Sequence, residues 1–180
     1  MNILEYALDV NKTKEEILEH ALNIAIEEGV DQVSIRKLAA SLNIAVGSMY
    51  NYYKDKEALM TAVSEHFWNN ILKDQEQLFR PGMGFTMFLE QYYGFLYGRL
   101  YRHDISWLSA MDETTKDQAL GLFMRVLEAD ERVIGSIWNM ELNQKAFCEY
   151  VLNNIMALIR TGESNCRFFI FLLDHLLYDA

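Results

Sequence analysis

Pro81 is the only proline among 180 residues. Proline removes a helical hydrogen bond and clashes with the preceding turn, so a chain that nearly lacks it can form long, uninterrupted helices. Glycine is also scarce, with nine residues, while leucine, alanine, glutamate and methionine recur throughout. Hydrophobic residues make up 51% of the chain, enough to build a sizeable core. The sequence therefore predicts an all-α fold.

The expected helices follow from apolar residues that recur at three- and four-residue spacing. The first is expected to begin at Thr13, because Thr13 and Glu16 match a capping box, and to end before Gly29. Pro81 and its glycine neighbours mark the strongest loop in the chain. The remaining helices are expected over about 34–41, 46–53, 56–79, 84–102, 104–111, 115–138, 142–161 and 164–178.

The stretch from Ser34 to Tyr53 has the pattern of two short helices joined by a tight turn at residues 42–44. The small side chain of Ala39 lets the two helices approach closely, and Leu38 and Met49 can pack beneath them. The outer face of the second helix is then free to enter a DNA major groove. The sequence thus predicts a helix-turn-helix head followed by a larger helical body.

Charge is distributed unevenly along the chain. The formal net charge of −10 argues against nucleic-acid binding when it is taken alone. The window from Ser34 to Glu57, however, holds four cations and two anions, a net charge of +2 that leaves −12 for the rest of the chain. The basic window coincides with the predicted helix-turn-helix.

Three motifs in this region resemble, in order and spacing, the head of the tetracycline-repressor (TetR) family. They are SIRKLA at residues 34–39, NIAVGSMYNYY at residues 43–53 and KDKEAL at residues 54–59. The resemblance covers roughly the first third of the chain. It implies a DNA-binding domain over residues 1–58 and a helical-bundle domain for ligand sensing and dimerisation over residues 59–180. It also implies a cytoplasmic homodimeric repressor that a small effector releases from a palindromic double-stranded DNA operator.

The resemblance further implies roles for individual residues. Contact with DNA phosphates is implied for Ser34, Arg36, Tyr50 and Lys56, and contact with bases for Ala45, Val46, Gly47, Ser48 and Tyr52. Alternatively, the tyrosines could be ordinary core aromatics. The front of the second helix carries no lysine or arginine, so base recognition would be apolar, water-mediated or shape-based. We therefore expect modest affinity that depends strongly on salt.

Aromatic and methionine side chains are abundant beyond residue 60. Each alone fits a packed core as well as a ligand pocket, but together they favour a pocket for an apolar or aromatic effector. The candidate pocket residues are Trp68, Phe88, Tyr92, Phe95, Trp107, Met111, Phe123 and Trp138. Polar side chains that could orient a ligand there are Tyr93, Tyr97, Arg99, His103 and Asn139.

The last two expected helices carry apolar stripes that could join two subunits in a four-helix bundle. They could instead simply cover the core of the body. The residues assigned to the dimer interface are Phe147, Tyr150, Val151, Ile155, Leu158, Phe168, Phe171, Leu172 and His175.

The sequence favours no catalytic or metal centre. The four histidines are scattered along the sequence and form no metal-ligand pattern. Cys148 and Cys166 are too far apart for a CxxC pair, and we expect both to be reduced thiols of a cytosolic protein. We therefore expect no cofactor, no metal and no enzyme activity. We also expect no membrane segment, because the most apolar stretch is short and contains Asp174. Two other functions stay open: a helical ligand-binding or interaction module without DNA binding, and a helical-bundle enzyme.

Overall fold

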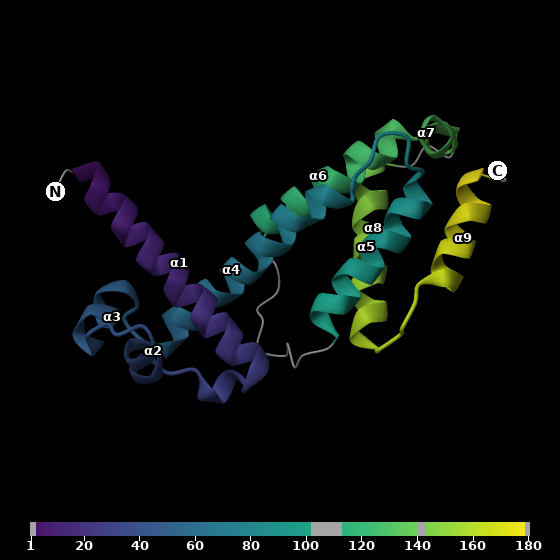
Figure 1. Cartoon of the computed structure of the whole chain (residues 1–180). Helices are drawn as coiled ribbons and strands as arrows, with labels where there is room; N and C mark the ends of the chain where they lie inside the picture. Colours follow the sequence, from purple (N-terminus) through teal and green to yellow (C-terminus); the bar gives the residue numbers. More distant parts are fainter. Residues whose placement is uncertain (1–2, 102–112, 140–142, 179–180) are drawn as a thin grey trace. The chain divides into compact units, whose positions relative to one another are not determined.

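The computed structural model describes residues 3–101, 113–139 and 143–178. All regular structure within these ranges is helical, which confirms the predicted all-α class (Figure 1). The described residues form two compact units, which divide between Asn70 and Ile71 inside the helix α4 (Lys56–Gln75). The predicted domain boundary after residue 58 lies near the start of the same helix and stays a prediction.

The first unit, here called the head, contains α1, α2, α3 and the first part of α4. Helix α1 begins at Ile3, so the predicted start at Thr13 is wrong; neither proline nor glycine interrupts residues 3–12. Gly29 follows the helix with φ 99° and ψ 151°, a conformation that is open mainly to glycine. The elements are α1 (Ile3–Glu27), the 3-10 turn η1 (Val30–Gln32), α2 (Ile35–Ser41) and α3 (Val46–Tyr52).

The second unit, here called the body, contains the end of α4 and the later helices. Helix α8 packs against α5 and α6, and α9 packs against α5 and α7 (Figure 1). Among the helices of the described ranges, none has the length and apolar character needed to cross a membrane. The elements are the 3-10 turn η2 (Glu76–Leu78), α5 (Phe85–Leu100), α6 (Glu113–Ala129), α7 (Glu131–Asn139), α8 (Gln144–Arg160) and α9 (Arg167–Tyr178).

One expected helix of the body is wrong. Residues 115–138 form two helices, α6 and α7, because the chain breaks at Asp130. The Asp130 side chain accepts hydrogen bonds from the backbone N–H groups of Val133 (3.5 Å) and Phe85 (3.1 Å). It thereby caps the first turns of two helices, a role that favours a break at this position. The helix expected over 104–111 lies outside the described residues.

Candidate nucleic-acid interface

The turn between α2 and α3 is fixed by local hydrogen bonds. The Ser34 side chain accepts from the Lys37 N–H (3.1 Å) and so caps α2. After α2, Asn43 adopts φ 54°, a left-handed conformation that asparagine tolerates better than most residues. The Ile44 N–H then donates to the Ala39 carbonyl oxygen (2.8 Å) and closes the turn. These bonds set the direction in which α3 leaves the turn.

A small apolar core beneath the two helices determines which face of α3 points outward. Ala39, Leu38 and Met49 are almost completely buried, and Tyr53 is 8% exposed, so the predicted core is largely formed. The opposite face of α3 is open: Val46 is 38% exposed and Tyr50 52% exposed. The surface that would read DNA is therefore not occupied by its own core.

The remaining residues expected to face bases lie on or beside this open face. Ala45 and Gly47 are exposed, while Ser48 and Tyr52 are half-buried. A methyl group built on Gly47 would touch nothing within 4 Å apart from its own neighbourhood in the helix. Packing against the described residues thus gives no reason for glycine at position 47, whereas close approach of another molecule would.

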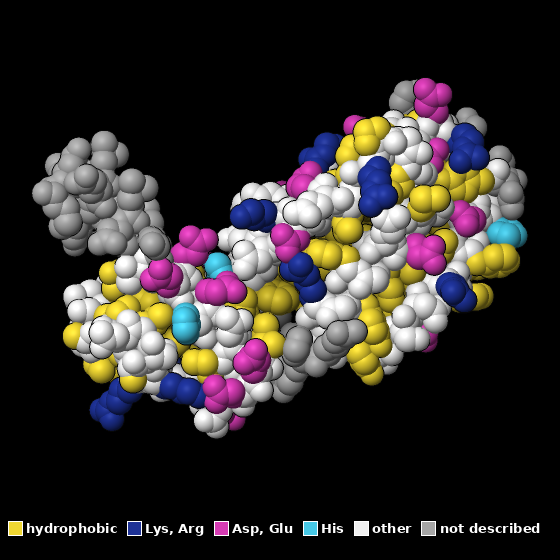
Figure 2. Space-filling model, viewed as in Figure 1, with side chains coloured by type: hydrophobic (Ala, Val, Ile, Leu, Met, Phe, Trp, Pro, Cys, Tyr) yellow, Lys and Arg dark blue, Asp and Glu magenta, His cyan; other side chains and the backbone are white. Residues whose placement is uncertain are grey.

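A groove beside α3 collects the residues expected to contact phosphate. It has a volume of about 380 Å³ and brings together the predicted Ser34, Arg36, Tyr50 and Lys56. Lys54 and Asp55 also line the groove but were not among the predicted site residues. The charge of Lys54 within the basic window was the signal that could have identified it. Figure 2 shows basic side chains on this part of the head.

Some charged groups of the groove form hydrogen bonds within the chain, and others are exposed. The Asp55 side chain accepts from the Ala58 N–H (2.8 Å) and so caps α4, while Lys54 is 83% exposed. The Lys56 ammonium donates to the Val30 carbonyl oxygen (3.1 Å), which orients it from α4 toward the 3-10 turn. Three cations and one anion line the groove. Such a groove suits an anion with several oxygen atoms, such as a phosphodiester.

The model of the family "Bacterial regulatory proteins, tetR family" matches residues 17–63, which run from within α1 to within α4. The match covers 47 of the 180 residues, so it relates this segment, and not the whole chain, to that family. An HTH-type transcriptional regulator of Staphylococcus aureus is 30% identical over 70 residues. The match covers 39% of this chain, and it spans only 38% of that relative.

Solved structures with a similar fold cover most of the chain. The fatty acid degradation regulator FadR from Bacillus halodurans has a TM-score of 0.58 at 14% identity, over 90% of this chain and 96% of its own. FadR from Bacillus subtilis, in complex with stearoyl-CoA, has a TM-score of 0.54 at 15% identity, over the same shares. A TetR variant from Acinetobacter baumannii, in complex with minocycline, has a TM-score of 0.51 at 20% identity, over 89% and 92%. At these identities the likeness is one of fold.

In the body, several of the expected pocket residues form an aromatic cluster. The rings of Phe88, Tyr92 and Phe123 lie with centroids 4.8–5.6 Å apart and are buried, while Phe95 is half-buried beneath the Arg99 guanidinium. The Tyr92 hydroxyl donates to Gln75 (3.1 Å), and burial raises the pKa of this phenol. Trp68 belongs to the head unit and is buried there. Trp107, Met111 and the side chain of Trp138 lie outside the described residues, as do His103 and the side chain of Asn139.

Three of the residues proposed to orient a ligand, Tyr93, Tyr97 and Arg99, are engaged in other contacts. The Tyr93 hydroxyl donates to the Glu163 carbonyl oxygen (2.6 Å), and the Tyr93 and Tyr97 rings stack at 6.0 Å. Burial, Cys166 and Glu163 raise the pKa of Tyr93 to about 12, so it remains a donor at neutral pH. Arg99 pairs with Asp74 at 2.6 Å. Within the described residues, no group of three histidine, cysteine or acidic side chains is arranged to hold a metal ion.

The residues expected at the dimer interface fall into two sets. On α8, Phe147, Val151 and Ile155 are buried within the chain and have little surface to offer a partner, whereas Tyr150 is 59% exposed. On α9, Phe168 is 75% exposed and Phe171 54% exposed. Leu172, Leu176 and His175 are also exposed on α9, and Leu158 on α8 is half-buried. The open apolar surface therefore lies mainly on α9.

Proposed function

We propose that this chain is a TetR-family transcriptional regulator that binds a palindromic DNA operator as a homodimer. The observation that carries the proposal is the exposed face of α3 beside a groove lined by three cations and the Tyr50 hydroxyl. A helix with an exposed front face fits the major groove, and the neighbouring cations meet the phosphates on either side.

In this proposal one set of residues of the head contacts phosphates and another set contacts bases. Ser34, Arg36, Tyr50, Lys54 and Lys56 bind phosphates and fix the register on the duplex. Ala45, Val46, Gly47, Ser48 and Tyr52 face the base edges. In a two-fold dimer the two α3 helices would enter successive major grooves, about 34–36 Å apart.

Selection of bound duplexes from a random pool by the purified chain tests this proposal directly. We expect a palindrome whose two half-sites are separated by one helical turn. The double variant Tyr50→Ala with Lys56→Ala should lose binding while its circular dichroism and oligomeric state stay unchanged. Lys73→Ala is the matched control, because Lys73 is an exposed cation roughly 25 Å along α4 from Lys56.

We propose that dimerisation uses the exposed apolar face of α9 together with Tyr150 on α8. The side chains involved would be Tyr150, Phe168, Phe171, Leu172 and Leu176. Figure 2 shows hydrophobic side chains over α9. A contiguous apolar surface of this kind on a helix is typical of a protein interface. Sedimentation velocity should give a dimer, and Phe171→Asp should give a monomer.

We also propose a repressor that a small apolar or aromatic effector releases from DNA. The aromatic cluster of the body and its buried Tyr92–Gln75 pair support an apolar ligand with a polar orienting group. The effector must favour the conformation with low operator affinity, since it can shift the equilibrium only by its difference in affinity. Stearoyl-CoA and minocycline are two probes, and loss of the operator complex on titration is the result expected for a true effector.

The alternative is a helical ligand-binding or interaction module that lacks DNA binding. The absence of lysine and arginine from α3 and the net charge of −10 favour it. Recovery of no enriched duplex, at low as well as moderate salt, would support this alternative over the regulator.

A further inference from the structure

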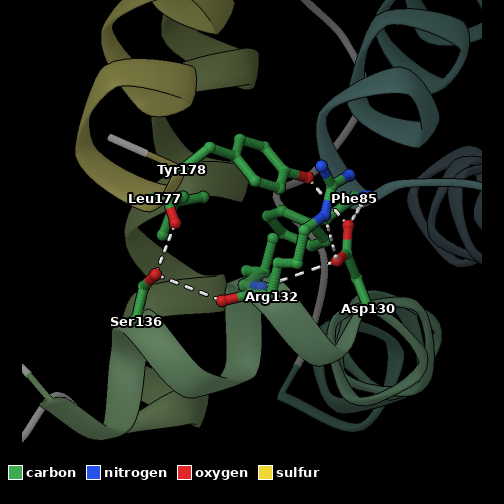
Figure 3. A network of polar contacts seen from close by, with 7 residues as sticks. Phe85, Asp130, Arg132, Ser136, Leu177 and Tyr178 are labelled. Atoms are coloured by element: carbon green, nitrogen blue, oxygen red, sulfur yellow. Dashed lines mark hydrogen bonds and ion pairs between the residues drawn. The ribbon is translucent and has the colours of Figure 1, made fainter. Parts of the chain in front are cut away.

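Asp130, at the corner between α6 and α7, holds three elements of the body together (Figure 3). One oxygen of its side chain, Oδ2, accepts from the Phe85 N–H (3.1 Å) at the start of α5 and from the Tyr178 hydroxyl (2.7 Å) in the last turn of α9. Oδ1 accepts from the Val133 N–H (3.5 Å) in α7. One buried carboxylate therefore joins residues that are 45 and 48 positions away in sequence.

Two further residues of α7 contact the same end of α9. The Arg132 guanidinium lies over the Tyr178 ring, 4.7 Å from its centroid, and the Ser136 hydroxyl donates to the Leu177 carbonyl oxygen. Burial and the bond to Asp130 raise the pKa of Tyr178 to about 12, so its hydroxyl remains a donor at neutral pH. Asp130, Arg132, Ser136 and Tyr178 are called the α9 clasp below.

Helix α9 packs against α5 and α7 through one face. Of its twelve residues, only Leu173 and Leu177 are buried. The face that carries Phe168, Phe171 and Leu172 is open. Because only two side chains of α9 are buried, polar contacts add to this packing in fixing the direction of the helix. The α9 clasp supplies those contacts at the C-terminal end.

We propose that Asp130 and Tyr178 are positioning residues for self-association, which fix α9 in the orientation that presents its apolar face to a second copy of the chain. The inference rests on the proposed dimer through α9. Because Asp130 also caps α5 and α7, a shift of the α6–α7 corner changes the direction of α9. Self-association is therefore coupled to the arrangement of the helices that surround the aromatic cluster.

The test compares Tyr178→Phe with Asp74→Asn by sedimentation over a wide concentration range. Tyr178→Phe removes the hydroxyl that donates to Asp130 and leaves the ring in place. Asp74→Asn is the matched control, because it breaks a carboxylate contact between α4 and α5 in the same unit without touching α9. Tyr178→Phe should raise the dimer dissociation constant about fivefold or more, since a hydrogen bond to a charged acceptor is lost. Asp74→Asn should leave the dimer dissociation constant unchanged, although both substitutions should lower the free energy of unfolding measured in urea.

Three results would overturn the inference, and they can be told apart. If Tyr178→Phe associates as tightly as the unmodified chain, the α9 clasp does not position the interface. If Asp74→Asn weakens association as much as Tyr178→Phe does, the effect is general loss of stability. If the unmodified chain stays monomeric at every concentration, the proposed dimer itself fails.

Discussion

Gly47 is the smallest residue on the open face of α3, and within the described residues a Cβ built on it would meet no heavy atom within 4 Å outside its own stretch of helix. Alanine at this position should raise the free energy of unfolding by up to about 1 kcal/mol, because glycine is a poor helix former. The same substitution should weaken operator binding, because its methyl group projects toward the proposed DNA surface. Chemical unfolding and fluorescence anisotropy measure the two effects separately. Gly47→Ala that binds DNA as tightly as the unmodified chain would contradict the proposed close approach.

At the same scale, residue type alone did not determine where the aromatic side chains lie. Phe88 and Phe123 are buried in the body, whereas Phe168 and Phe171 are exposed on α9. All four are phenylalanines within predicted helices, and only contacts from distant parts of the chain distinguish them. The phosphate-binding candidates were easier to predict, because Ser34, Arg36, Tyr50 and Lys56 belong to one local motif.

At the scale of elements, the corner between α6 and α7 should make stability sensitive to acid. Burial alone would raise the pKa of Asp130, but hydrogen bonds from Tyr178, Phe85 and Val133, with the nearby Arg132, outweigh it and hold the pKa below its ordinary value of 3.8. The ionised form therefore favours the folded state. This contribution is complete above the ordinary pKa and is lost as the pH falls through the lower, folded value.

Asp130→Asn should accordingly lower the free energy of unfolding at neutral pH. It should also reduce the decrease in this free energy as the pH falls below about 4. Urea unfolding at a series of pH values measures this effect. Asp117→Asn is the control, because Asp117 is an exposed carboxylate paired with Lys145 at 2.9 Å. The control should keep the acid-dependent fall of the unmodified chain. If Asp130→Asn shows the same loss of stability at acid pH as the unmodified chain, another group causes that loss.

The elements also show how far sequence periodicity can predict this fold. The α2–α3 pair was predicted closely, because its caps and its turn depend on residues within a few positions of one another. The break at Asp130 was missed, because the donors that favour it include Phe85 and Tyr178, which are remote in sequence. The start of α1 was missed because a local signal was misleading: Thr13 matches a capping signal, but the helix continues through it.

At the scale of the whole molecule, a strongly acidic chain is proposed to bind a polyanion through a small basic groove. Arg36, Lys54 and Lys56 supply three cations in each subunit and therefore six in a dimer. If all six meet phosphates, log K for the operator should fall against log salt with a slope of about −5. Lys54→Gln should reduce the magnitude of that slope by about 2, since it removes one phosphate contact from each subunit. Anisotropy titrations at several salt concentrations measure both, and an unchanged slope in Lys54→Gln would exclude Lys54 from the interface.

The exposed front of α3 offers the aliphatic groups of Ala45 and Val46 where other recognition helices offer a charge. In the major groove, thymine is distinguished by its C5-methyl group, which favours apolar partners. Replacing thymine by deoxyuridine in the operator removes only that methyl group and preserves every base pair. We expect such an operator to bind more weakly, so the proposed regulator would discriminate among sites largely by the hydrocarbon surface of the DNA.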